Sequence, residues 1–330
     1  MKNNIKDYQW PSSFIRFDKK YNFKKRNILN FKKLNRIENF FRDEFNHKNL
    51  HIFPSARACI ALVLRYLKIT REDEVFVNKW VSHCIFNTVG AYANITTKLD
   101  KPKLSIAVHK WGQIQLLNKN KTKYLIEDSV DSLISSNKAL FVNNGDFEIF
   151  SLPKIIGSIS GGIIISKNKK FISFCKKEQK KNIKLGSYQF EKKVEDINKK
   201  KTFDTWLYHE SWNTFMDINA LDDITRCIPN YKINKRLIYK RKKIFEEKFN
   251  FKIFENKRIG PVIPIPLKYV KNKKLMKKNF MIKHINKDNK DLNNFIEVFI
   301  IPIHFKIKNT LFLKSIKVME KSLKKNAKTI

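Results

Sequence analysis

The chain has few of the residues that mark the more specialised classes of protein. Its 330 residues include only four cysteines and eight glycines, and 30 acidic side chains stand against 69 basic ones. No two of the cysteines have Cys-x-x-Cys spacing, which argues against a zinc site or a dithiol redox motif. We expect no metal site, and we expect small, mostly buried thiols in a reducing compartment. The cysteines are Cys59, Cys84, Cys175 and Cys227.

Long hydrophobic runs are also missing. The longest aliphatic stretches, such as 163–165 and 299–301, have the length of core strands and fall far short of the roughly 18 apolar residues of a membrane span. The first six residues, MKNNIK, are polar and do not lead into the apolar segment of a signal peptide. Hydrophobic residues make up 42% of the chain, enough for a globular fold with two lobes. We therefore expect a cytoplasmic protein without a membrane span.

Basic residues are in large excess, and the formal net charge is +39. A nucleic-acid-binding protein concentrates such charge in a patch with interleaved aromatic residues. Here lysine is dispersed along the whole chain beside abundant Asn, Ile and Phe, a set that AT-rich codons enrich. We therefore favour compositional drift and expect no specific nucleic-acid partner. A basic module that binds polyanions stays open as an alternative, because the charge attracts phosphorylated ligands in either case.

Short apolar runs alternate with helical patterns over residues 51–166. This alternation predicts an α/β fold whose sheet is mostly parallel. The expected strands are 74–77, 105–108, 124–126, 147–150 and 162–166, and the expected helices start at Ser55 and span 83–89. Candidate functional residues follow the ends of these strands, where open α/β sheets place their ligands.

Three regions follow from the pattern: a lead-in segment over 1–50, a large α/β domain over 51–220 and a small C-terminal α+β domain over 221–330. A helix is expected over 32–45 in the first. The last should contain a long helix over 221–249 with a break near Pro229, strands at 262–266 and 298–303, and a helix over 312–323. Residues 167–201 have helical tendency, 206–215 fit no element, and 286–294 suggest an exposed loop.

One segment points to specific chemistry. Lys154 lies in the run Phe150-Ser151-Leu152-Pro153-Lys154, and the pair Gly161-Gly162 follows it. Most lysines of this chain should be solvated side chains, but apolar residues surround Lys154, which predicts a lowered pKa and a nucleophilic amine. Asp128 ends another apolar run, although it could equally be a strand-end turn residue. A lysine that forms a Schiff base and a carboxylate that holds a pyridine nitrogen are what pyridoxal phosphate (PLP) requires.

Other candidates are weaker on their own. Ser55 is a good N-cap, and a capped helix start can bind phosphate through its backbone N–H groups. Trp80 follows an expected strand, where a tryptophan is also common as core or rim packing. His109 follows the next strand, and we interpret it as a turn or supporting residue, not a catalytic one. Cys84 lies close enough to Trp80 to line the same pocket.

These segments together resemble the DegT-type sugar aminotransferases, which are fold-type I PLP enzymes. The resemblance covers roughly 53–166, about a third of the chain, and it rests on six ordered segments. They are Pro54-Ser55-Ala56-Arg57-Ala58, Asp73-Glu74-Val75, Asn78-Lys79-Trp80-Val81-Ser82, Gly90-Ala91, Leu125-Ile126-Glu127-Asp128 and Gly145 through Lys154 with Gly161-Gly162. The resemblance implies PLP as cofactor and a homodimer, because a partner subunit usually completes the site in this family.

The resemblance also implies a role for each matching residue. Lys154 would be the Schiff-base lysine and Asp128 the ring-nitrogen contact, and these two are the predicted catalytic residues. Trp80 would stack on the cofactor ring. The predicted cofactor-binding set is Ser55, Ala56, Arg57, Trp80, Asp128, Asp131, Ser151 and Lys154. The implied reaction moves an amino group, with glutamate as donor, to a nucleotide-linked keto-sugar in surface polysaccharide, lipopolysaccharide or amino-sugar biosynthesis.

The chain departs from the family pattern at several positions. Asp131 stands where an amide side chain is usual, Ser160 stands where an acidic residue usually precedes the glycine pair, and the turn before Asp73 lacks its glycine. The segment that leads to Lys154 is also shorter than usual. A degenerate PLP-fold protein and a dehydratase-like PLP enzyme therefore stay open. Lys154 argues against the second, because related dehydratases have histidine there.

Overall fold

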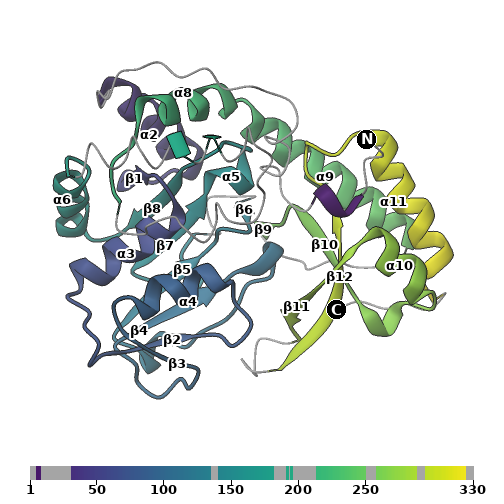
Figure 1. Ribbon diagram of the computed structural model, residues 1–330, viewed down its shortest axis with the longest axis horizontal. Helices are drawn as coiled ribbons and strands as arrows, with labels where there is room; N and C mark the ends of the chain where they lie inside the picture. Colours follow the sequence, from purple (N-terminus) through teal and green to yellow (C-terminus); the bar gives the residue numbers. More distant parts are fainter. Residues whose placement is uncertain are drawn as a thin grey trace.

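The structure is a computed structural model of the 330-residue chain. It describes residues 5–8, 31–134, 140–181, 191–192, 194–195, 213–249, 258–287 and 294–324. These residues form a large lobe around a central sheet and a smaller lobe around a second sheet (Figure 1). Within these ranges, no helix has both the length and the apolar character to cross a membrane.

The large lobe contains a seven-stranded sheet in the order β1-β8-β7-β5-β4-β2-β3. Strands β3, β2, β4, β5 and β7 run parallel to one another, whereas β8 is antiparallel to both β7 and β1. The strands are β1 (Leu50–Phe53), β2 (Glu74–Val77), β3 (Asn94–Thr96), β4 (Leu104–Val108), β5 (Tyr124–Asp128), β7 (Phe147–Ser151) and β8 (Gly162–Ser166). The mostly parallel α/β sheet expected from the sequence is confirmed, with β1 and β3 as additional strands.

Helices cover both faces of this sheet. One core joins it to α3 (Ala56–Tyr66), α4 (His83–Gly90) and α6 (Lys169–Glu178). The other core joins it to α2 (Phe31–Phe45), α5 (Leu152–Ile155) and α8 (Ile218–Cys227). Side chains of β8 alternate between the two faces of the sheet, because Ile163 and Ile165 belong to the second core and Ile164 belongs to the first. The apolar spacing of the sequence therefore accounts for a sheet that is buried on both faces.

The small lobe has a three-stranded antiparallel sheet in the order β10-β12-β11. Its elements are α9 (Asn230–Phe249), β10 (Val262–Pro266), α10 (Lys273–Asn279), β11 (Met281–Asn286), β12 (Phe295–Pro302) and α11 (Asn309–Ser322). The predicted break near Pro229 is confirmed, since α8 ends at Cys227 and α9 begins at Asn230. The predicted domain boundary at 220/221 falls inside α8 and stays a prediction.

Short elements complete the described chain. A two-stranded ladder of β6 (Leu133–Ile134) and β9 (Arg258–Ile259) joins the lobes. The 3-10 helices are η1 (Ile5–Tyr8), η3 (Lys110–Gly112), η4 (Lys119–Lys121) and η7 (Leu267–Tyr269). Expectations for 182–190, 196–212 and 288–293 lie outside the described residues.

The backbones of the two lobes cross closely at one point. A Cβ atom on Gly260 would lie 2.2 Å from the carbonyl oxygen of Trp111, and one on Gly112 would lie 2.9 Å from the nitrogen of Gly260. Gly112 also has a φ of +89°, which side-chain-bearing residues rarely adopt. The two glycines thus let η3 pack directly against the start of the small lobe.

Candidate active site

The predicted site residues lie at the carboxyl ends of the parallel strands. Asp128 is the last residue of β5, Lys154 lies in α5 directly after β7, and Trp80 follows β2. His109 follows β4, which is paired with β5 in the register Val108↔Asp128. Because parallel strands end at one edge of a sheet, the fold brings these positions together.

Asp128 is a buried carboxyl group with one unused oxygen. Its Oδ1 accepts the backbone N–H of Val130 at 3.1 Å. Its Oδ2 is buried and has no hydrogen-bond partner among the residues that the structure describes. Burial raises the pKa of Asp128 to about 7, Asp131 adds to the rise, and the Val130 N–H and Lys154 oppose it. An unsatisfied buried acceptor of this kind fits the protonated nitrogen of a pyridine ring.

Lys154 is mostly buried and is paired with a carboxylate. Its side chain is 19% exposed, and its Nζ lies 2.5 Å from Oδ1 of Asp131. Burial alone would lower the pKa of Lys154, but the charge and hydrogen bond of Asp131 outweigh it, with smaller contributions from Cys84 and Asp128, so the pKa is raised. The lowered pKa that we expected from the apolar neighbours is therefore wrong. The neighbours are apolar, but the amine itself has an acidic partner.

The glycine pair after Lys154 packs against the start of α3. A Cβ atom on Gly162 would lie 2.3 Å from the carbonyl carbon of Ser55 and 2.4 Å from the nitrogen of Ala56. Gly161 donates its N–H to the Pro54 carbonyl at 2.8 Å. Only a residue without a side chain allows β8 to come this close to a helix start. The glycine pair and the segment around Ser55 are far apart along the chain, but they pack together in the fold.

The start of α3 has the features of a phosphate seat. Ser55 caps the helix, and its Oγ accepts the N–H of Ala58 at 3.1 Å. The N–H groups of a first helical turn have no acceptor within the helix and can bind an anion. Ser151 lies near this helix start in the register of the sheet. It pairs with Gly162, and Gly162 also pairs with Phe53, which precedes Ser55 by two residues. The structure therefore brings Ser151 to the same end of the sheet as the capped helix.

Arg57 and Cys84 border the same space. Burial lowers the pKa of Arg57, and Cys84 opposes this effect. The charge of the same thiol also raises the pKa of Lys154. Its Sγ is 3.1 Å from Oγ of Ser82. The proximity of Cys84 to the predicted pocket agrees with its position shortly after Trp80.

Trp80 is exposed and stacks on a residue of the small lobe. Its ring centroid lies 4.1 Å from that of His284 with an angle of 9° between the planes, and 45% of Trp80 is exposed. Lys110 donates from its Nζ to the His284 carbonyl at 2.8 Å and contacts the Trp80 carbonyl at 3.4 Å. One face of the indole is thus covered by His284. The predicted stacking of Trp80 on a cofactor ring stays a prediction.

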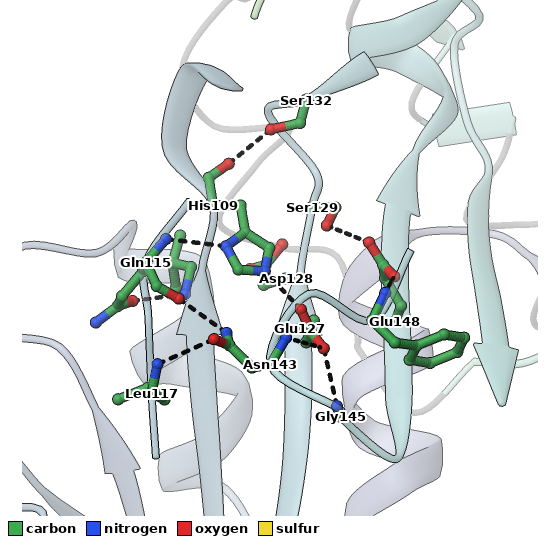
Figure 2. A network of polar contacts seen from close by, with 12 residues as sticks. His109, Gln115, Leu117, Glu127, Asp128, Ser129, Ser132, Asn143, Gly145 and Glu148 are labelled. Atoms are coloured by element: carbon green, nitrogen blue, oxygen red, sulfur yellow. Dashed lines mark hydrogen bonds and ion pairs between the residues drawn. The ribbon is translucent and has the colours of Figure 1, made fainter. Parts of the chain in front are cut away.

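His109 belongs to a buried network that supports the strand of Asp128 (Figure 2). Its Nδ1 accepts the N–H of Gln115 at 3.1 Å, so its Nε2 carries the proton and donates to Oε2 of Glu127 at 2.9 Å. Burial, together with the charge of Arg258, keeps the pKa of His109 well below its ordinary value. The imidazole is therefore neutral and structural, in line with our interpretation of His109 as a supporting residue.

Glu127 connects this network to the turn before β7. Its Oε1 accepts the N–H groups of Asn143 at 3.1 Å and Gly145 at 2.9 Å (Figure 2). A Cβ atom on Gly145 would lie 2.7 Å from Cγ of Glu127, so the turn needs glycine there. The pKa of Glu127 is raised by burial, which these N–H groups oppose. The strands that end in Asp128 and lead to Lys154 are thereby held together.

A second buried network contains residues that the sequence analysis did not single out. Oε1 of Glu148 accepts the hydroxyl of Ser129 at 2.7 Å and is 2.6 Å from Nη2 of Arg258, while Oε2 accepts the N–H of Phe141 at 2.7 Å. Both side chains of the Glu148–Arg258 pair are fully buried. Arg258 comes from β9, so a small-lobe charge fixes Ser129, the residue after Asp128. The sequence does contain a hint of this network, because Glu148 is a charged residue within the otherwise apolar run 147–150.

Comparisons with known proteins identify the family of this chain and its fold. A family model described as "Putative PLP-dependent aminotransferase" matches residues 37–327, most of the chain. No curated protein matches. The mostly parallel sheet with its covering helices matches the fold-type I PLP aminotransferases. This chain belongs to the PLP-dependent aminotransferase family.

Solved structures with the same fold include several aminotransferases. A DegT DnrJ EryC1 StrS aminotransferase from Brucella abortus is 12% identical, with a TM-score of 0.61 over 90% of this chain and 91% of that chain. The aminotransferase TlmJ from Streptoalloteichus hindustanus is 11% identical, with a TM-score of 0.61 over 88% and 90%. The "putative sugar aminotransferase Spr1654" from Streptococcus pneumoniae, PMP-form, is 13% identical, with a TM-score of 0.54 over 88% and 92%. At these identities the likeness concerns the fold.

Proposed function

We propose that this PLP-dependent aminotransferase transfers an amino group to a nucleotide-linked keto-sugar, with glutamate as donor, in the biosynthesis of amino sugars for surface polysaccharide or lipopolysaccharide. The structural likeness to sugar aminotransferases supports the sugar as acceptor class. We further propose a cytoplasmic homodimer in which the partner subunit completes the site, as the DegT resemblance implies. The excess of basic residues suits an acceptor that carries phosphates.

The observation that carries the proposal is the relation between Asp128 and Lys154. Asp128 pairs with Ile149 across β5 and β7, and Lys154 follows β7 by one turn. The carboxyl group offers a buried Oδ2 without a partner among the described residues, and the amine faces the same end of the sheet. Bound PLP supplies an aldehyde that condenses with amines and a ring that accepts electrons.

Each residue of the site then has a defined task. Asp128 would hold the ring nitrogen through Oδ2, while Ser55, Ala56, Arg57 and Ser151 would hold the phosphate. Trp80 would cover one face of the ring. Lys154 would bind the cofactor aldehyde and, once a substrate amine replaces it, move the proton at the substrate Cα. Asp131, paired with Lys154, would keep the lysine protonated and oriented before the cofactor arrives.

The first test locates the cofactor. Recombinant protein is incubated with PLP and reduced with borohydride, and peptide mapping identifies the modified lysine. We expect the adduct on Lys154, and none in Lys154→Ala, whereas Lys317→Ala on α11 should behave like wild type because Lys317 is exposed and far along the chain. An adduct on another lysine, or none in the wild type, would refute the assignment of Lys154.

The second test addresses the substrates. L-glutamate, L-glutamine and L-alanine are each added to the PLP-loaded protein, and the conversion of PLP to the amine form is followed by absorbance. We expect L-glutamate to react fastest. The amine form is then mixed with keto-sugars that carry or lack a nucleoside diphosphate. Equal reaction of both kinds of acceptor would argue against a nucleotide-linked substrate.

A further inference from the structure

A second lysine lies at the junction of the lobes beside the site. Lys110 of η3 donates to the His284 carbonyl at 2.8 Å and lies 3.4 Å from the Trp80 carbonyl. The open edge of β11 thus receives a charged side chain from the large lobe. The uncharged side chain of Gln113 also binds this edge of β11, since its Nε2 donates to the Asn286 carbonyl at 2.9 Å. Lys110 is therefore fixed in place by neutral acceptors, and its charge is not neutralised by them.

The charges around Lys110 are unbalanced. Burial lowers the pKa of Lys110 to about 8, Asp131 opposes this, and Lys283 and Lys154 lower it further. Burial also lowers the pKa of Lys283, again opposed by Asp131. Three lysines therefore act on a single carboxylate, which is already paired with Lys154 at 2.5 Å. Within the described ranges, neither Lys110 nor Lys283 forms a salt bridge of its own.

Lys283 comes to this place from the small lobe. It lies on β11 between Met281 and Ile285, which pack in one cluster with Trp111 of η3. Residues that alternate on a strand share a face, so Lys283 points toward η3, where Lys110 lies. His284, the next residue, stacks on Trp80. Two cations from different lobes thus converge next to the proposed cofactor site.

We propose that Lys110 and Lys283 form a subsite for the oxyanion group of a substrate, a carboxylate or a phosphate. Lys110 and Lys283 share only the carboxylate of Asp131, which is already paired with Lys154, so an arriving anion stabilises both cations through charge-assisted hydrogen bonds. Lys110 is held by two backbone carbonyls, so little side-chain freedom is lost on binding. The inference rests on the proposed function, since it assigns the subsite to a substrate of that same site.

The competing explanation is that Lys110 serves only as a structural link between the lobes. Gln113 provides the matched control, because Gln113→Ala removes a comparable bond to β11 without removing a charge. A pure link predicts similar losses of stability for Lys110→Gln and Gln113→Ala, and no change in anion binding for either. An anion subsite predicts that only loss of the lysine charge weakens anion binding.

The test measures binding, not turnover. Isothermal titration calorimetry on the PLP-loaded protein uses glutarate as an unreactive dicarboxylate and UDP as a diphosphate. Wild type is compared with Lys110→Gln, Lys283→Gln, their double variant, Gln113→Ala and the remote charge control Lys317→Gln. We expect the double variant to bind at least one probe about tenfold or more weakly, which is about 1.4 kcal/mol. Loss of glutarate binding assigns the subsite to the amino-acid carboxylate, and loss of UDP binding assigns it to the sugar nucleotide.

Two results would overturn the inference. The first is unchanged binding of both probes in the double variant. The second is an equal loss of anion affinity in Lys317→Gln, which would reveal general attraction by the net charge of +39. Borohydride mapping is done on every variant. If no adduct forms on Lys154 even in the wild type, the proposed function fails, while the same calorimetry on the protein without PLP still reports on the anion subsite. If the adduct forms and anion binding is unchanged, only the subsite fails.

Discussion

Asp131 and Lys154 form an ion pair at the centre of the site, with Oδ1 and Nζ 2.5 Å apart. The DegT resemblance implies that an amide side chain is usual at the position of Asp131, and this chain has a carboxylate there instead. A carboxylate raises the pKa of the lysine amine, whereas condensation with an aldehyde needs the neutral amine. The pair therefore orients Lys154 but makes its neutral form scarcer in the cofactor-free protein.

Replacement of Asp131 should change how PLP uptake depends on pH. In Asp131→Asn and Asp131→Gln the pKa of Lys154 should fall, because burial acts without the opposing carboxylate. The rate of PLP incorporation near pH 7 should then rise relative to wild type, and the difference should shrink as the pH approaches the raised pKa of the wild-type lysine. Stopped-flow absorbance over a pH series measures this rate. A slower uptake by both variants at all pH values would show that orientation by Asp131 matters more than the pKa.

Asp128→Asn should separate stability from activity. The carboxyl group has a pKa of about 7 in the folded protein against an ordinary value of 3.8. Below about pH 4 it is protonated in the folded and unfolded states and contributes nothing. Between about pH 4 and 7 the unfolded chain releases the proton while the folded protein keeps it, so the free energy of unfolding falls as the pH rises. The cofactor-free variant should thus be more stable than wild type at pH 8, by at most ~4 kcal/mol, and equally stable at pH 4.

Urea unfolding of the cofactor-free proteins at both pH values measures this difference, with Asp100→Asn as a control at an exposed position. Transamination by Asp128→Asn should fall by several orders of magnitude, which is about 4 kcal/mol or more of barrier. A variant that is less stable at pH 8 would mean that the buried carboxylate has partners that favour its charged form. Near-normal activity would mean that another acid contacts the ring nitrogen.

Local patterns in the sequence predicted the parts of the site that lie on single elements. Strand ends located Asp128, the apolar run and glycine pair located Lys154, and the N-cap located Ser55, because each depends on neighbours within one or two turns of chain. The sheet followed from the alternation of such elements. These local features nominate the residues, whereas the roles predicted for them come from the resemblance to the DegT-type family.

The rest depends on contacts between distant segments. Strand β11 was missed because Lys283 and His284 interrupt its apolar pattern. Arg258 could not be paired with Glu148 from spacing, since 110 residues separate them. The direction of the Lys154 pKa was wrong for the same reason, because Asp131 precedes it by 23 residues and meets it only in the fold.

Removal of Arg258 should strongly destabilise the protein. Arg258→Met leaves Glu148 as a buried charge without its cation, and breaking a buried ion pair typically costs about 3–5 kcal/mol. The double variant Arg258→Met, Glu148→Gln should recover much of this loss, since no uncompensated charge stays buried. Arg226→Met, which removes a cation that is 60% exposed, should change the free energy of unfolding by less than about 1 kcal/mol. Urea titrations of the four proteins test this, and a double variant as unstable as Arg258→Met would mean that lost packing dominates.

Gly162→Ala should displace the proposed phosphate-binding helix start although it replaces no polar side chain. The new Cβ would lie 2.3 Å from the carbonyl carbon of Ser55 and 2.4 Å from the nitrogen of Ala56, so β8 and the start of α3 must move apart. Overpacking of this kind costs about 1–3 kcal/mol of stability, and the displaced helix start should weaken PLP affinity by about tenfold or more. Gly90→Ala is the matched control, because its Cβ would meet only Cδ1 of Ile95 at 3.6 Å, an ordinary contact. Thermal unfolding gives the stabilities, and PLP titration of the cofactor-free proteins gives the affinities. If Gly162→Ala loses stability but binds PLP as tightly as Gly90→Ala, the start of α3 does not hold the phosphate.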